Sequence, residues 1–192
     1  MSDTVATVTR STLPDLSLTE WAVLALIVEQ PTHGFALAKE LAPDGDLGRI
    51  WTVRRPIVYR ALAQLEERNL IEPLGAEPGD RGPVRTLMGP TRAGKAAVRL
   101  WLRTPSQHVR ELRTHLLLQL RLLDRRGLDL SPLATAQLEQ LIPTLAALRD
   151  QADTTVGFAG LLARWRYESA QAAARILEGI IAGAVPPAPG SA

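Results

Sequence analysis

The sequence predicts a mainly α-helical protein with one small β-hairpin, and three observations lead to this fold class. Apolar residues recur at helical spacing over most of the chain. Two short β-like runs flank a stretch rich in glycine and proline between residues 70 and 88. The length of 192 residues allows one large domain or two small ones, and a content of 46% hydrophobic and 22% charged residues is ordinary for a globular protein.

Three helices are expected before the hairpin. Ser17 followed by Glu20 predicts a capping box, and the helix that it opens should end at Pro31, which has no N–H to donate. A second helix should cover about residues 32–41, followed by a loop over 42–53. A third should begin near Pro56 and end at Asn69, which tolerates the left-handed conformation.

The hairpin and the rest of the chain follow the same patterns. Strands are expected over 70–74 and 84–88, with turns over 75–83, and Thr91 should cap the next helix. Three further helices are expected, the second of them kinked at Pro143. They should cover about residues 107–125, 133–151 and 155–184.

The order helix, helix, loop, helix, hairpin, helix is that of a winged helix-turn-helix. The predicted organisation is therefore a DNA-binding domain of this class followed by a helical dimerisation domain, with disordered ends. The boundaries are 1–16 for the disordered arm, 17–104 for the winged helix-turn-helix domain, 105–184 for the helical dimerisation domain and 185–192 for the disordered tail.

The third helix carries the pattern expected of a recognition helix. One side is apolar and should pack on the first two helices, through Ile57, Val58, Ala61, Leu62 and Leu65. On the other side, Arg60 and Gln64 can read base edges. Phosphates should mainly be held by Arg55, Tyr59, Arg81 and Arg85, and a further candidate for DNA contact is Arg54 at the start of the helix. An exposed helix with solvated arginines would give the same pattern.

The distribution of charge supports a local basic surface, although the net charge is only +2. No acid lies between Asp46 and Glu66, and none lies between Arg81 and Arg103. These two segments contain ten basic residues in all, namely Arg49, Arg54, Arg55, Arg60, Arg81, Arg85, Arg92, Lys95, Arg99 and Arg103.

At these residues the sequence resembles the PadR family of transcriptional regulators. In the second helix, the motif that resembles the family is His33-Gly34-Phe35-Ala36-Leu37. The recognition helix and the residues after it carry Ile57-Val58-Tyr59-Arg60-Ala61-Leu62, Leu65-Glu66 and Asn69-Leu70-Ile71-Glu72. The wing and the helix that follows it carry Gly82-Pro83-Val84-Arg85, Thr91-Arg92-Ala93-Gly94-Lys95 and Trp101-Leu102. Arg110-Glu111-Leu112 resembles the start of the C-terminal helices in larger members. The chain departs from the family pattern at Phe35, where tyrosine is usual, at Asn69, where glycine is common, at Pro56 and at Thr86-Leu87-Met88 in the wing.

The resemblance implies a homodimer that binds a double-stranded DNA operator, as a repressor relieved by a small apolar or aromatic effector. Effectors of the family often bind between the wing domain and the dimer helices, where Trp101 and Trp165 are the candidate contacts. No cofactor is expected. The same face of the third helix could instead dock an acidic protein, so a helical protein–protein adaptor remains the alternative.

Other classes find little support in the sequence. The chain has no cysteine, no apolar run long enough to cross a membrane and no signal-peptide pattern, which predicts a soluble cytoplasmic protein. No catalytic arrangement stands out, so we do not expect an enzyme. His108, Glu111 and His115 could face one side of a helix and ligate zinc, but the same spacing fits an exposed stripe, and no metal site is predicted.

Overall fold

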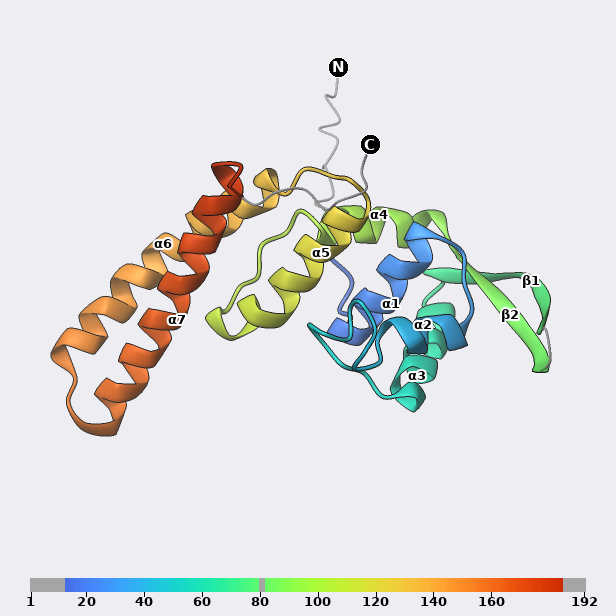
Figure 1. Cartoon of the computed structure of the whole chain (residues 1–192), viewed down its shortest axis with the longest axis horizontal. Helices are drawn as coiled ribbons and strands as arrows, with labels where there is room; N and C mark the ends of the chain where they lie inside the picture. The colour runs from blue at the N-terminus through green and yellow to red at the C-terminus, as the bar shows by residue number, and fades with distance from the viewer. Residues whose placement is uncertain (1–12, 80–81, 185–192) are drawn as a thin grey trace, which may run out of the picture.

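The computed structural model describes residues 13–79 and 82–184 (Figure 1). The predictions for residues 1–12, for the tail 185–192 and for Arg81 lie outside the described residues. The elements are α1 (Leu18–Glu29), α2 (Gly34–Glu40), α3 (Arg55–Glu67), β1 (Ile71–Gly79), β2 (Gly82–Pro90), α4 (Arg92–Trp101), η1 (Val109–Glu111), η2 (Leu112–Leu116), α5 (Leu117–Arg125), α6 (Ser131–Thr154) and α7 (Gly157–Ile181). The fold is a winged helix-turn-helix followed by C-terminal helices, as predicted.

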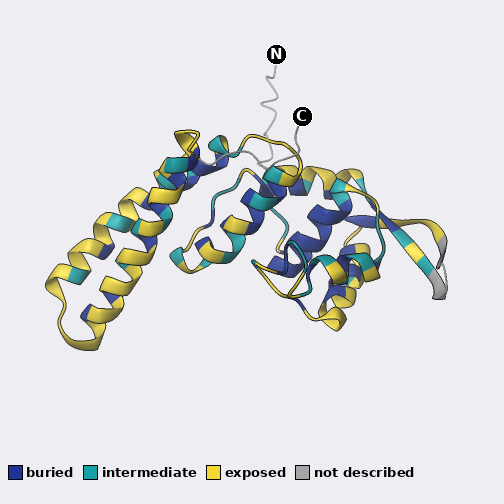
Figure 2. Cartoon of the chain, viewed as in Figure 1, coloured by how far each residue is buried: buried dark blue, intermediate teal, exposed yellow. Residues whose placement is uncertain are grey.

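Helix α1 is the centre of the N-terminal part of the protein, residues 17–104, which we call the winged unit. Every residue from Leu18 to Ile27 is buried, and Figure 2 shows this helix almost entirely in the colour of buried residues. Helices α3 and α4 and strand β2 pack around it. The predicted capping box is confirmed, because Ser17 Oγ accepts from the Glu20 N–H at 3.3 Å and Glu20 Oε2 accepts from the Ser17 N–H at 2.8 Å.

The β-hairpin is longer than the sequence pattern predicted. The expected turn over 75–83 is wrong, because β1 runs to Gly79 and β2 begins at Gly82. The two strands pair antiparallel, with a shift in register between Pro73 and Gly75 that accommodates a residue without an N–H. A further bridge joins Thr32 to Met88, and it attaches the wing to the segment that precedes α2.

The segment 107–125 is not a single α-helix, contrary to the prediction. It begins with the 3₁₀ turn η1 and the π-helical turn η2 before α5 starts at Leu117. The turn η2 buries Leu112 and Leu116, whereas η1 buries none of its residues. Ser106, just before this segment, donates its N–H to Gln137 at 2.7 Å, which links the start of the C-terminal part to α6.

Helices α6 and α7 form an antiparallel hairpin that extends away from the winged unit (Figure 1). Helix α6 continues through Pro143. Helix α7 turns small side chains towards α6, because Gly160, Ala163, Ala170 and Ala174 are buried. Its opposite side carries large apolar residues in solvent. None of the described helices has the length and apolar character that crossing a membrane requires.

Candidate nucleic-acid interface

Helix α3 presents a basic side to solvent and an apolar side to the core. Arg54, Arg55, Tyr59 and Arg60 are exposed, and Gln64 is half-buried at the edge of the same surface. With Arg85 of β2, which is also half-buried, these side chains form what we call the basic face. The predicted apolar side is confirmed for its four other members, which are Val58, Ala61, Leu62 and Leu65, but Ile57 is 39% exposed.

The exposure of Ile57 follows from where α3 begins. Arg54 is the N-cap and Pro56 lies in the first turn, so residue 57 precedes the point at which α1 and α2 cover the helix. The first buried position of the helix is Val58. An apolar residue in the first turn beside two arginines is therefore part of the exposed surface, which the spacing alone could not reveal.

Close packing of α2 against α3 fixes the orientation of Tyr59. A Cβ atom added to Gly34 would lie 2.8 Å from Tyr59 Cε1 and 3.0 Å from Leu62 Cδ1. The absence of a side chain at Gly34 thus lets the tyrosine ring lie against the start of α2. The end of α3 is equally defined, because Asn69 adopts the predicted left-handed conformation with φ of 55°.

The wing brings a second arginine to the same surface as α3. The guanidinium of Arg85 lies 4.7 Å from the ring centre of Phe35, on α2, and that of Arg55 lies 5.5 Å from the same ring. Arg55 is also 5.6 Å from the ring of Tyr59. Three elements separated in sequence therefore meet at one basic, aromatic surface. Arg81, the other predicted wing contact, lies outside the described residues.

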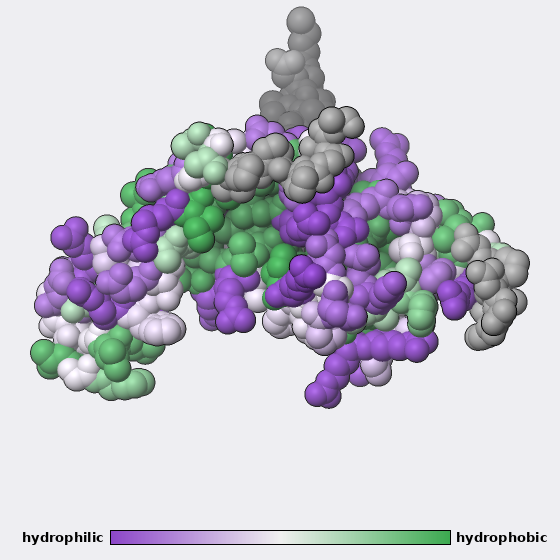
Figure 3. All heavy atoms as spheres, viewed as in Figure 1, coloured by the Kyte–Doolittle hydropathy of each residue, from purple (hydrophilic) through white to green (hydrophobic). Residues whose placement is uncertain are grey.

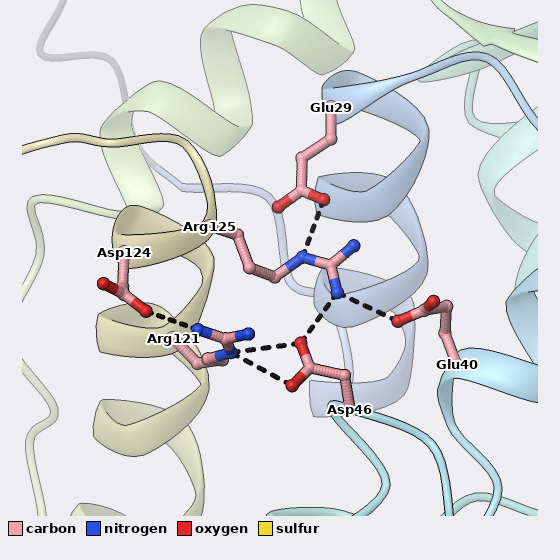
Figure 4. Close-up of polar contacts among 6 residues, drawn as sticks. All are labelled: Glu29, Glu40, Asp46, Arg121, Asp124 and Arg125. Atoms are coloured by element: carbon pink, nitrogen blue, oxygen red, sulfur yellow. Dashed lines mark hydrogen bonds and ion pairs between the residues drawn. The ribbon is translucent and has the colours of Figure 1, made fainter. Parts of the chain in front are cut away.

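A cluster of ion pairs joins α5 to the C-terminal ends of α1 and α2 and to the loop that follows α2 (Figure 4). Arg125 contacts Glu29 at 3.0 Å, Glu40 at 2.9 Å and Asp46 at 2.8 Å. Arg121 contacts Asp46 at 3.0 Å and also pairs with Asp124. These contacts connect the ends of α1 and α2 and the loop before α3 to a helix of the C-terminal part.

The protein surroundings shift the pKa values of this cluster in opposite directions. Burial raises the pKa of Glu29, and Arg125 only partly offsets this effect. Burial would also raise the pKa of Asp46, but hydrogen bonds from Arg121 and Arg125 outweigh it and lower the pKa. Glu29 Oε1 is buried without a hydrogen-bond partner among the described residues, which agrees with its preference for the proton.

A cavity of about 250 Å³ lies between the winged unit and the first C-terminal helix. Trp21 and Trp101 stack at 5.1 Å between ring centres and form part of its wall. Gln119 and Ser106 also line it, and Gln119 Oε1 and Ser106 Oγ are buried without hydrogen-bond partners in the described part of the chain. Trp165, the second predicted ligand contact, does not line this cavity and is 73% exposed on α7.

Comparison with known protein families adds an independent finding. Residues 23–100 match the sequence profile described as "Transcriptional regulator PadR-like family". This match covers less than half of the chain and lies within the winged unit. The matched segment contains α3 and the hairpin, which carry the residues of the basic face. No curated protein matches the chain.

Solved structures of PadR proteins are similar to this chain at low identity. Bacillus subtilis PadR in complex with operator DNA is 17% identical, with 84% of this chain and 97% of that chain covered and a TM-score of 0.43. The same protein in complex with p-coumaric acid is 16% identical, with coverage of 90% and 98% and a TM-score of 0.40. The PadR-like regulator BC1756 from Bacillus cereus is 16% identical, with coverage of 86% and 96% and a TM-score of 0.37.

The three residues considered as zinc ligands lie in an irregular segment. His108 is exposed, while Glu111 and His115 are half-buried in the turns η1 and η2. Glu111 accepts a hydrogen bond from the His108 backbone N–H at 3.2 Å, so it caps the turn. Burial lowers the pKa of His115, against the effect of Glu111. Within the described residues, no three metal-ligating side chains come together.

Proposed function

We propose that this protein is a PadR-like regulator that binds a DNA operator by inserting the N-terminal part of α3 into the major groove. Arg60 and Gln64 would read base edges, while Arg54, Arg55, Tyr59, Arg81 and Arg85 would mainly hold phosphates. The observation that carries the proposal is the division of α3 into a basic face and a buried side. Because the buried side is fixed by the core, the face is presented in one orientation.

We propose further that the protein acts as a homodimer held by the C-terminal part, residues 105–184. The outer face of α7, formed by Phe158, Leu161, Leu162, Trp165 and Ile176, is exposed in the single chain. These residues lie on one side of the helix, opposite the small residues that contact α6. Figure 3 shows apolar surface at the free end of the hairpin. A patch of this kind favours burial against a second copy.

The finer proposal for regulation is a repressor released by a small aromatic effector. The cavity beside Trp21 and Trp101 supports it, because it combines an aromatic wall with polar atoms that have no hydrogen-bond partner among residues 13–79 and 82–184. A planar ligand with a hydrogen-bond donor could satisfy Gln119 Oε1. Such a ligand would contact residues of both α1 and the C-terminal part, and so it could change the placement of the recognition helices.

A selection of bound fragments from a random DNA library, followed by a salt titration, tests operator binding. We expect a selected duplex to bind more tightly than an unrelated duplex, with an affinity that falls steeply as salt rises. The adaptor alternative predicts no enrichment of any sequence and no affinity for duplex DNA. Either of those two results would contradict the proposed function.

Tryptophan fluorescence tests the effector proposal with a panel of aromatic acids and alcohols. A ligand of the cavity should quench fluorescence and weaken operator binding, and operator DNA should weaken ligand binding by the same factor. Gln119→Leu should abolish the hydrogen bond to the ligand, whereas Trp165→Phe should leave quenching by the cavity unchanged. If no compound alters operator affinity, the effector proposal fails while DNA binding stands.

A further inference from the structure

Phe35 is a large apolar side chain beside the arginines of the basic face. It lies in the first turn of α2, a helix that otherwise turns its apolar residues to the core, and it is 44% exposed. The buried core of the winged unit does not include it. An exposed phenylalanine can be accidental, so its neighbours decide whether it has a role.

Two arginines from different elements lie against this ring. Arg85 comes from strand β2 of the wing and Arg55 from the first turn of the recognition helix α3, at 4.7 and 5.5 Å from the ring centre. Both distances fall within the range of about 6 Å in which a guanidinium is attracted to the face of an aromatic ring. Phe35 is therefore the point at which the wing and α3 share a contact.

The imidazole of His33 also lies beside Arg85, but it does not form a contact that could replace the ring of Phe35. His33 Nδ1 accepts a hydrogen bond from the Ala36 N–H at 3.1 Å, so in the neutral ring the proton lies on Nε2. Arg85 Nη1 is 3.5 Å from that Nε2, and two groups that both carry protons do not form a hydrogen bond. The favourable contact of Arg85 at this point is the ring of Phe35.

We propose that Phe35 is a positioning residue for DNA binding, which holds Arg55 and Arg85 in the arrangement in which they meet the phosphate backbone. An arginine side chain has many rotamers, and holding two of them before binding lowers the entropy lost on binding. The inference rests on the proposed function. It adds a residue that contacts the DNA-binding arginines and fixes the spacing between the wing and α3.

Phe35→Leu removes the ring and keeps an apolar side chain of similar reach. We expect it to weaken binding to the selected duplex and to an unrelated duplex alike, by about threefold to tenfold. Each lost contact between the ring and an arginine should lower the affinity for DNA by about a few-fold. Phe35→Tyr keeps the ring and should bind within about twofold of the wild type. Phe35→Met is a second variant without a ring, to be used if the leucine variant does not fold.

The salt dependence distinguishes positioning from a direct phosphate contact. Phe35→Leu leaves both arginines in place, so the slope of log affinity against log salt should stay close to that of the wild type. Arg85→Ala removes a cation, so that slope should fall by about one. Because Phe35 acts partly through Arg85, its loss should weaken binding less in the Arg85→Ala background than in the wild type.

The result that overturns the inference is a folded variant without the ring that binds both duplexes as tightly as the wild type. Losses from Phe35→Leu and Arg85→Ala that multiply fully in the double variant would overturn it as well. A wild-type protein that binds no duplex contradicts the proposed function itself, so the two failures are distinguishable.

Discussion

The winged unit and the α6–α7 hairpin bury their apolar side chains in different ways. In the winged unit, α1 is buried along almost its whole length by elements of the same chain. In the hairpin, α7 buries four small residues together with Leu177 and Ile180, and it leaves Phe158 78% and Trp165 73% exposed. The winged unit thus completes its core within a single chain, whereas the α6–α7 hairpin presents the surface expected of an interface.

The largest effect on assembly and on DNA binding should come from a charge placed on the outer face of α7. Trp165→Asp would bury a carboxylate in the proposed dimer interface, and we expect the dissociation constant of the dimer to rise by roughly a hundredfold or more. Operator affinity should fall by a similar factor, because the second half-site is no longer bound by a linked subunit. Sedimentation and DNA binding measure the two effects.

Arg166→Asp is the matched control, since Arg166 is the exposed neighbour of Trp165 on the same helix and does not belong to the outer face. It should leave the association state unchanged. A Trp165→Asp protein that sediments as the wild type does would place the dimer interface elsewhere.

A pair of tryptophan variants sharpens the comparison of the two regions. Trp101 is 4% exposed and stacks on Trp21, so Trp101→Ala should lower the free energy of unfolding by about 3–5 kcal/mol at every protein concentration. Trp165→Ala should destabilise the protein only through weaker association, so its effect should depend on protein concentration. Urea unfolding at two concentrations measures both. Concentration-independent losses of equal size would remove the distinction between the regions.

The ion-pair cluster that connects the two regions should have a smaller effect. Arg125→Met leaves Glu29 buried without its cation, and we expect a loss of about 1–3 kcal/mol at neutral pH, reduced because these side chains are partly exposed to solvent.

The pH dependence of that loss follows from the two carboxyl groups. The pKa of Glu29 is raised above 4.5, so Glu29 takes up a proton as pH falls through that raised value, and the deficit of the variant should shrink there. The pKa of Asp46 is lowered below 3.8, so the stabilisation from its ion pairs persists above 3.8 and is lost only as pH falls further. A deficit that is constant between pH 7 and pH 4 would contradict this account.

The smallest effect concerns the end of the recognition helix. Asn69 has a φ of 55°, so Asn69→Ala should lower the free energy of unfolding by about 1 kcal/mol, whereas Asn69→Gly should be neutral or stabilising. Thermal unfolding of the two variants makes the comparison. Equal effects of alanine and glycine would mean that the left-handed conformation is not the cause.

Local patterns predicted the winged unit well because its signals lie close together in sequence. The capping box at Ser17 and Glu20, the cap at Thr91 and the left-handed Asn69 are each decided within a few residues. The ion pairs of Arg125 and the contact of Phe35 with Arg85 join residues that are far apart in the chain, so no local pattern contains them. The departure from the family pattern at Phe35 is visible in the sequence, but its contacts with Arg55 and Arg85 are not.

The C-terminal part shows the same limit in another form. The apolar residues of α7 recur at helical spacing, yet a periodic stripe does not say whether a side chain packs within the chain or against another one. The small residues that face α6 became visible only with the paired helices in place. The turns η1 and η2 were missed, because leucine spacing alone does not distinguish a π turn from an α-helix.

The central claim is that the basic face of α3 reads DNA, and the most direct measurement compares two arginine variants on two duplexes at two salt concentrations. Arg60→Ala should weaken binding to the selected operator by about 1–3 kcal/mol and spare an unrelated duplex, with relaxed preference at one base position. Arg85→Ala should weaken both duplexes in parallel and lower the salt slope by about one. A folded Arg60→Ala protein that binds both duplexes as the wild type does would contradict the assignment of α3 as the recognition helix in this orientation.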